Sequence, residues 1–384
     1  MFKRLSIISF AIFLLSGSLE LIPIFSNLNL KLISIFFPTT FVLLTILKRK
    51  YYGKQLFFLV MIIFFLLFSI LLNINTHNYN AEKVSNLIII ITICMIFPIF
   101  IFENDNDIFQ FFNTLLVGSI LISIISLLNI DSVVDTGRLS FNEGNPIWLA
   151  RAISLGFIWI CLKYKYKLVK LPIFLLVSFM LLTSILLTGS KAPLFACIIA
   201  MIVIFFNEMK YILINKKNLT ASFILILLSI PSIYLVLLYL PETIKNRFQI
   251  EKIKDESRIE LYNLSFRLIK ENFDGIGIGM FHNYSYFYYP HNILLESFVE
   301  FGILFGGVLI LILFISILVL FIKRKQSKAK FIFFILFIVS FFNAMFSGDL
   351  TSPKELYLSI AMAFIPIKSV DIKFKNNIVK RENI

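Results

Sequence analysis

The chain has 384 residues, of which 59% are hydrophobic and 15% are charged, and it carries a formal net charge of +14. This composition excludes an ordinary water-soluble domain, because the mean hydropathy is +0.91 and apolar runs of about 17–25 residues recur, each long enough to cross a bilayer as a helix. The positive charge does not indicate a nucleic-acid partner, because Lys and Arg concentrate in alternate loops, as the positive-inside rule requires.

We predict an all-α, polytopic membrane helix bundle with about twelve transmembrane helices and both termini in the cytoplasm. Residues 1–384 form a single integral membrane domain in this interpretation. The predicted spans are 5–25, 30–47, 55–72, 84–102, 108–130, 146–162, 171–187, 192–206, 219–240, 292–322, 331–347 and 356–367.

A long extracytoplasmic loop is predicted over residues 241–290. Ser257 and Glu260 fit a capping box that starts an amphipathic surface helix. The apolar residues expected on one face of this helix are Ile259, Tyr262, Phe266 and Ile269. Arg258 and Arg267 are nine positions apart and therefore face opposite sides of the helix, so both cannot serve one ligand.

Polar residues gather on the predicted outer side of the bundle. They are Arg138, Asn145, Lys191, His291 and Asp349. This one-sided cluster favours a site that opens to the exterior, whereas a transporter would place its site near the midplane of two related halves.

The segment between Gly275 and Gly302 contains the residues that most strongly indicate a functional site. Its glycine run is either a plain turn or a ligand contact, in which Gly277 and Gly279 would expose backbone N–H groups to an anion. The aromatic residues that follow, which end at Tyr289, are either an interfacial belt or a surface for stacking sugar rings.

His291 lies at the aqueous boundary and is a candidate base, because a histidine there titrates near neutral pH. Asn292, Glu296 and Glu300 follow at intervals of four and share one helix face. Carboxylates at membrane depth indicate either functional residues or a buried ion network, for which Arg151 is a candidate partner.

No metal or cofactor is predicted for this site. The three histidines lack metal-ligand spacing, and the three cysteines lie within apolar runs, where they are packing residues. The cysteines are Cys94, Cys161 and Cys197.

Four segments together resemble the O-antigen ligase and O-antigen polymerase family of bacterial envelope membrane proteins. RLSFNEGNPIWLA (138–150) is similar to its Arg…Asn-Pro segment, and LTGSKAPL (187–194) is similar to its TGSR-Gly turn. Residues 257–281 look like its Arg-containing lead into a Gly-x-Gly run, and PHNILLESFVEFGI (290–303) is similar to its His-Asn…Leu-Glu…Glu-x-Gly-Ile segment.

The resemblance implies a metal-independent membrane glycosyltransferase of the GT-C type on the outer face of the bacterial inner membrane. Its donor would be a sugar chain on undecaprenyl diphosphate, and a chain-length regulator protein is a further candidate partner. The match assigns His291 as general base and Arg258 as diphosphate ligand. Lys191 stands where the family has arginine, which keeps the charge but loses the bidentate fork that suits phosphate.

The physical chemistry of glycosyl transfer is consistent with these roles. The departing diphosphate needs cations, for which Arg138 joins the two residues named above, and the acceptor hydroxyl needs a base. Asn292 or Glu296 would orient the imidazole, and Tyr289 and Glu300 would contact the substrate.

We favour a polymerase that joins lipid-linked repeat units into O-antigen or capsule polysaccharide. The alternative within the family is a ligase that transfers finished polymer to lipid A–core. The alternative from another class is a transporter of polysaccharide or lipid-linked sugar, which would need a polar pathway that reaches both faces.

Overall fold

The computed structural model describes residues 1–46, 54–131, 133, 137–141, 144–214, 242–247 and 258–368. Most of these residues are helical and none lies in a β-strand, which confirms the predicted all-α class for the described part of the chain. Seven helices in this part are long and apolar enough to cross a membrane. Each predicted span that falls on described residues contains a helix, whereas the span predicted at 219–240 lies outside them.

The helices in chain order are α1 (Phe2–Leu19), α2 (Leu30–Ile46), α3 (Lys54–Thr76), α4 (Ala81–Ile91), the π-helix η1 (Thr92–Ile96), α5 (Phe97–Ile101), α6 (Asp105–Leu128), α8 (Pro146–Lys165), α9 (Leu171–Leu187), α10 (Lys191–Ile214), α12 (Glu242–Arg247), α14 (Arg258–Glu271), the 3₁₀-helix η3 (Met280–Asn283), α15 (Ile293–Lys323), α16 (Lys328–Phe346) and α17 (Lys354–Phe364).

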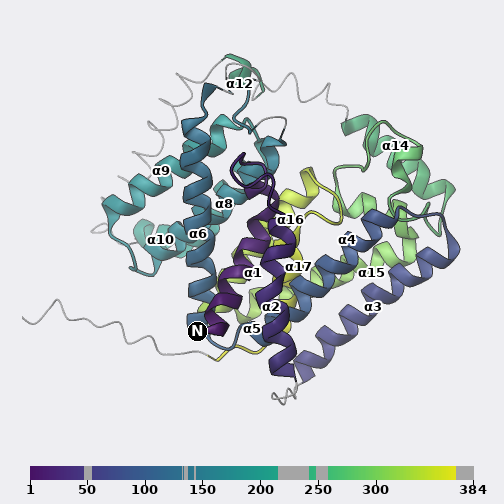
Figure 1. Cartoon of the computed structure of the whole chain (residues 1–384), viewed down its shortest axis with the longest axis horizontal. Coiled ribbons are helices and arrows are strands. Elements are labelled where there is room, and N and C mark those ends of the chain that lie inside the picture. The colour runs from purple at the N-terminus through teal and green to yellow at the C-terminus, as the bar shows by residue number, and fades with distance from the viewer. Residues whose placement is uncertain are drawn as a thin grey trace, which may run out of the picture.

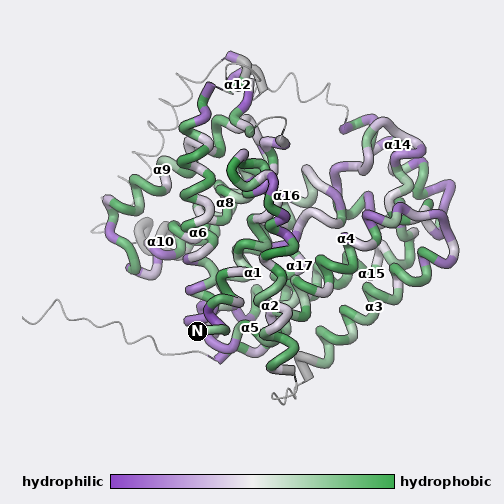
Figure 2. Tube along the Cα trace, viewed as in Figure 1, coloured by the Kyte–Doolittle hydropathy of each residue, from purple (hydrophilic) through white to green (hydrophobic). Residues whose placement is uncertain are grey.

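The bundle has two flanks joined by a central group of helices (Figure 1). On one flank, α8 packs against α6, α9 and α10, while α3, α4 and α15 occupy the other flank. Helices α1, α2, α16 and α17 lie between them. Hydrophilic residues gather near the N-terminus and, at the opposite end of the bundle, around α14, with apolar helices between (Figure 2). This distribution is typical of a protein that crosses a membrane.

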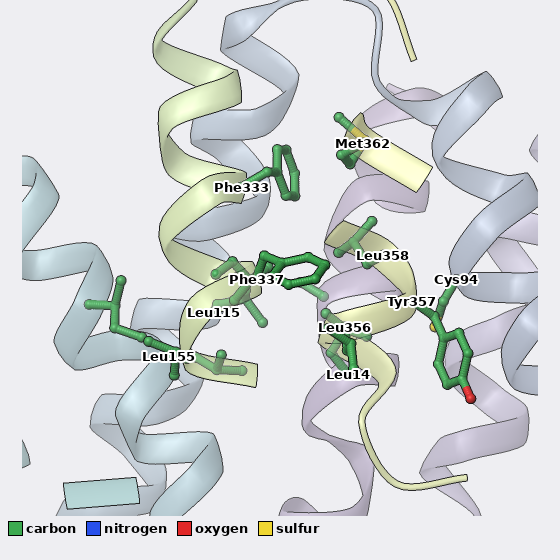
Figure 3. Packing of buried hydrophobic residues seen from close by; sticks show 14 of the residues in the cluster. Leu14, Cys94, Leu115, Leu155, Phe333, Phe337, Leu356, Tyr357, Leu358 and Met362 are labelled. Carbon is green, nitrogen blue, oxygen red and sulfur yellow. The ribbon is translucent and has the colours of Figure 1, made fainter. Parts of the chain in front are cut away.

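Helix α17 lies in the centre of the hydrophobic core (Figure 3). Leu358 on α17 is fully buried, as are Phe337 on α16 and Cys94 in η1. Cys94 lies four positions before Pro98, whose ring clashes with the carbonyl four residues earlier. The helix is wider there, over the five residues of η1, as expected where a proline interrupts the regular ladder. The other two cysteines are also buried, which confirms their packing role.

Helix α15 is interrupted at Gly302, whose φ of 81° and ψ of 177° are not helical. The break leaves two backbone carbonyls of the preceding turn without helical hydrogen bonds, and backbone N–H groups of the glycine run donate to them. Ile276 N donates to the Val299 carbonyl at 2.9 Å, and Gly277 N donates to the Glu300 carbonyl at 3.2 Å. The glycine run therefore holds the first turns of α15 in place.

The predicted helix is confirmed as α14, and its location at a membrane surface stays a prediction. Its buried residues are Leu261, Ser265 and Leu268, and the helix packs against α15. Ile259 and Phe266, on the predicted apolar stripe, are 51% and 53% exposed. An apolar stripe that faces a membrane rather than the bundle would leave these residues exposed in this way. The N-cap predicted at Ser257 lies outside the described residues.

Candidate functional site

His291 has an unusual backbone conformation. Its φ is 59°, in the left-handed region that residues with a side chain rarely adopt. The turn is held on its C-terminal side by Asn292, whose Oδ1 accepts hydrogen bonds from Leu294 N at 3.0 Å and Leu295 N at 3.2 Å and so caps α15. Strained backbone conformations of this kind cluster at functional sites, where the surrounding structure offsets their energetic cost.

The His291 ring lies among aromatic residues of the segment before it. Its centroid is 4.6 Å from that of Tyr289 and 5.8 Å from that of Phe287, both edge to face. Its Nδ1 is buried and has no hydrogen-bond partner among the described residues. Burial, followed by the charges of Arg258 and Arg151, lowers the pKa of His291 to about 4. The imidazole is therefore neutral near pH 7, in the protonation state that accepts a proton.

The charges acting on His291 come from three separate elements. Arg258 is the first residue of α14, Arg151 lies on α8, and Asp349 follows α16. The charge of Arg258 acts on His291, as the roles predicted for the two residues require, and those roles stay predictions. The prediction gave Arg151 only a structural role and gave Asp349 none, although Asp349 was among the polar residues of the predicted outer side.

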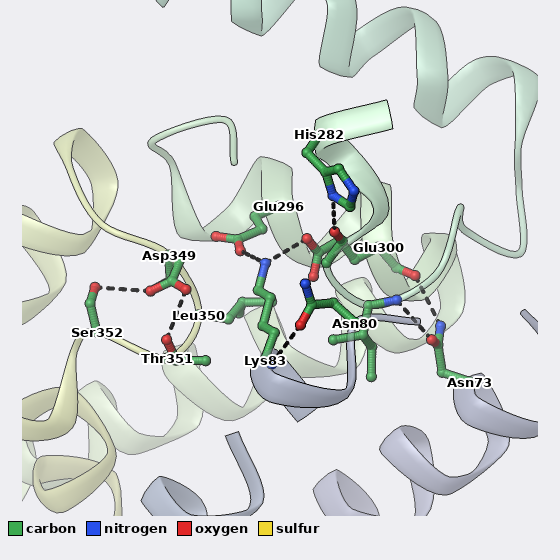
Figure 4. A network of polar contacts seen from close by, with 12 residues as sticks. Asn73, Asn80, Lys83, His282, Glu296, Glu300, Asp349, Leu350, Thr351 and Ser352 are labelled. Carbon is green, nitrogen blue, oxygen red and sulfur yellow. Dashed lines mark hydrogen bonds and ion pairs between the residues drawn. The ribbon is translucent and has the colours of Figure 1, made fainter. Parts of the chain in front are cut away.

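A buried ion network lies beside this turn (Figure 4). Lys83 on α4 donates from Nζ to Oε1 of Glu300 at 2.6 Å and to Oε1 of Glu296. Both glutamates are 0% exposed and the Lys83 side chain is 11% exposed. The structure thus supports the ion-network alternative for these carboxylates, and their partner is Lys83 rather than the predicted Arg151.

The orienting roles predicted for Asn292 and Glu296 do not fit this geometry. Asn292 Oδ1 is engaged as a helix cap, and Glu296 Oε1 is engaged by Lys83. Neither hydrogen-bonds His291 Nδ1, which has no partner in the described part of the chain. Glu300, predicted to contact substrate, is likewise held by Lys83.

The two glycines predicted to bind substrate have a packing role instead. Gly277 and Gly279 are buried and have φ of 99° and 74°. A Cβ on Gly277 would overlap the backbone carbonyl of Asn78, and one on Gly279 would lie 2.7 Å from the Cβ of Asn80. The absence of side chains lets the glycine run pack against the loop before α4.

Arg138 joins two of the segments that carry the family resemblance. Its Nε donates to the Thr188 carbonyl at 2.8 Å and its Nη2 to Ser190 Oγ at 3.1 Å. The Ser190 hydroxyl in turn donates to the Pro146 carbonyl at the start of α8, at 3.4 Å. Lys191 is the first residue of α10. The diphosphate contacts expected of Arg138 and Lys191 stay predictions.

Several buried polar atoms of α8, α15, α16 and the His291 turn lack a hydrogen-bond partner among the described residues. They are His291 Nδ1, Arg151 Nε, Asn343 Oδ1, Glu296 Oε2 and Glu300 Oε2. Buried polar groups in native proteins are nearly always paired, with protein, with water or with a ligand. The unpartnered Nε–H of Arg151 is a donor that suits an anionic ligand, and the unpartnered nitrogen of His291 suits a proton transfer, whereas the three oxygens are acceptors that suit donors such as hydroxyls or water.

Comparison with known families gives one match. The family model described as O-antigen ligase matches residues 175–310, roughly a third of the chain, and these include Lys191, Arg258 and His291. The resemblance expected from the sequence motifs is confirmed over this range. No curated protein and no solved structure matches the chain.

Proposed function

Because residues 175–310 match the O-antigen ligase family, we propose that this chain is a membrane glycosyltransferase that polymerises oligosaccharide repeat units carried on undecaprenyl diphosphate. The product is O-antigen or capsule polysaccharide, made at the outer face of the bacterial inner membrane. The proposal includes about twelve transmembrane helices in a GT-C-like arrangement.

The observation that carries this proposal is the environment of His291. Its imidazole is partly buried and neutral, its Nδ1 has no hydrogen-bond partner among the residues that the structure describes, and Arg258 and Arg151 act on it electrostatically. A base next to cations is what the transfer of a sugar from a diphosphate requires, because a hydroxyl must lose a proton while an anion departs.

The proposed step is a direct displacement. The acceptor hydroxyl gives its proton to His291 as its oxygen forms a bond to the anomeric carbon of the donor. The bond between that carbon and the diphosphate oxygen breaks, and the electron pair leaves with undecaprenyl diphosphate. Arg258 stabilises the departing charge. A single displacement inverts the anomeric configuration.

Arg258 and Arg267 provide a matched pair of substitutions on one helix. Arg258→Ala should reduce chain extension severely, by about 10²–10³-fold, because the leaving diphosphate loses a preorganised cation. Arg258→Lys should recover only part of the activity, since lysine restores the charge without the planar fork. Arg267 is exposed, so Arg267→Ala should be nearly normal. Polymer ladders at equal expression check the series, and equal loss from both alanine variants would contradict the role of Arg258.

The pH dependence of kcat/KM should report the depressed pKa of His291. A base acts when it is unprotonated, so activity is retained above its pKa and lost as the pH falls through it. Since that pKa is about 4, kcat/KM should stay level from pH 8 to about pH 5 and fall below it. An acid limb centred near 6.5, the ordinary value for histidine, would show that His291 is not held neutral in this way.

The proposed orientation places the His291 turn outside the cell. A cysteine introduced at Tyr286, which is fully exposed, or at Lys252, which lies outside the described residues, should react with a membrane-impermeant thiol reagent in intact spheroplasts. The native cysteines are buried, so background labelling should be low. Labelling at Lys325 with protection of both other positions would place the site in the cytoplasm.

The lipid-linked sugars of a deletion strain test the polymerase assignment. A polymerase defect should leave single repeat units on undecaprenyl diphosphate. The ligase is kept as the second candidate because the matching family model carries that description. Full-length polymer stranded on undecaprenyl diphosphate would identify the chain as the ligase.

A further inference from the structure

Arg151 is a partly buried cation whose charge acts on His291, and the sequence motifs assign it no ligand role. It lies on α8, early in the helix that begins at Pro146, and its guanidinium reaches the segment between α16 and α17. It is not among the residues that carry the family resemblance.

The hydrogen bonds of Arg151 go to neutral oxygens. Its Nη2 donates to the carbonyl of Asn343 at 2.9 Å and to Oγ of Ser347 at 2.8 Å, and also to the Ser347 carbonyl. Its Nη1 makes one long bond, 3.3 Å, to Ser352 Oγ. A guanidinium has five N–H donors, and Nε is buried without a partner in the described residues. These contacts orient the group and leave part of its donor capacity unused, while its charge interacts with the carboxylates of Glu355 and Asp349.

Gly348 shows that the backbone approaches this guanidinium unusually closely. Its φ is +83°, and an added Cβ would lie 2.1 Å from Ser352 Oγ and 3.0 Å from both Nη1 and Nη2 of Arg151. A residue with a side chain would therefore overlap the Ser352 hydroxyl and crowd the guanidinium that it contacts.

The charge of Arg151 acts on His291 and on the neighbouring Tyr289 of the proposed site. It is one of the two cations that lower the pKa of His291, and it also acts on the hydroxyl of Tyr289. Arg258 approaches from α14 and Arg151 from α8, so the imidazole has cations on two independent elements. A diphosphate carries two phosphoryl groups, and two such cations can bind one each.

We propose that Arg151 is an anion-binding residue of this site and contacts the diphosphate of the lipid-linked donor together with Arg258. This inference rests on the function proposed above. The family that this chain resembles has an arginine where this chain has Lys191. Arg151 would supply the planar, bidentate guanidinium that lysine lacks.

The test is binding of the released product, measured with purified protein in lipid nanodiscs and without turnover. The probes are undecaprenyl diphosphate, undecaprenyl monophosphate, undecaprenol and inorganic diphosphate. The wild type should bind undecaprenyl diphosphate most tightly, and Arg151→Gln should weaken that binding by about tenfold or more while leaving undecaprenol unchanged. Inorganic diphosphate shows whether the phosphates alone suffice or the lipid is also needed.

Three controls separate the possible outcomes. Arg267→Gln, on an exposed face of α14, should bind all probes as the wild type does. If the wild type itself does not prefer the diphosphate, the proposed function fails; if it does and Arg151→Gln keeps that preference, only the role of Arg151 fails. Should Arg151→Gln not fold, Arg151→Lys replaces it, and wild-type affinity for the diphosphate in that variant would overturn the inference.

Discussion

Replacing His291 should abolish chain extension while the protein still folds and inserts. Loss of one acid-base group costs on the order of 10²–10⁴-fold in rate, and His291, the proposed base, is partly buried, neutral near pH 7 and acted on by the charge of Arg258. Polymer ladders from cells that express His291→Ala and the wild type at equal levels measure the effect.

The left-handed backbone of His291 supplies a matched control. A residue with a Cβ carries strain of about 1–2 kcal/mol at a φ of 59°. Histidine and asparagine tolerate this conformation better than alanine does, so His291→Ala could lose stability for reasons unrelated to catalysis. Asparagine, however, cannot act as a base. His291→Asn should therefore be as inactive as His291→Ala but more stable to heat. Normal ladders from His291→Asn would mean that the residue has only a conformational role.

Removing Lys83 should produce the largest loss of stability. Lys83→Met leaves Glu296 and Glu300, both 0% exposed, without their cation. Breaking a buried ion pair in this way costs about 3–5 kcal/mol, because uncompensated charge stays in an apolar surrounding. We expect a lower melting temperature and less monodisperse protein after extraction in detergent, compared with Lys270→Met on the exposed side of α14.

A compensated variant separates charge from packing in this network. Combining Lys83→Met with Glu296→Gln and Glu300→Gln removes the unpaired charges and should restore a large part of the lost stability. If the triple variant is no more stable than Lys83→Met alone, the network stabilises the bundle through packing, and the electrostatic account of it is wrong.

The helical character of the apolar spans could be predicted because local features determine it. A run of apolar residues must form a helix in lipid, where every backbone polar group needs an internal partner, and α15 and α16 follow this rule. His291 stood out because a histidine and two glutamates at the end of an apolar span are costly unless they have a use.

The partners of these residues could not be predicted, because they come from distant parts of the chain. Lys83 precedes Glu296 by more than two hundred positions, and Arg151 meets the loop after α16 at Ser347. The glycine run was ambiguous for a related reason. A glycine that must approach a ligand and one that must approach another segment, as Gly277 approaches Asn78, have the same local sequence.

Reconstitution of the purified protein tests the central claim most directly. The protein is placed in nanodiscs with an undecaprenyl-diphosphate-linked repeat unit as the only sugar substrate. We predict oligosaccharides of two or more repeat units on the lipid, one undecaprenyl diphosphate released for each bond formed, and an inverted configuration at the new linkage. Recovery of the donor intact, with neither extension nor release of undecaprenyl diphosphate in the presence of active wild-type protein, would contradict the account.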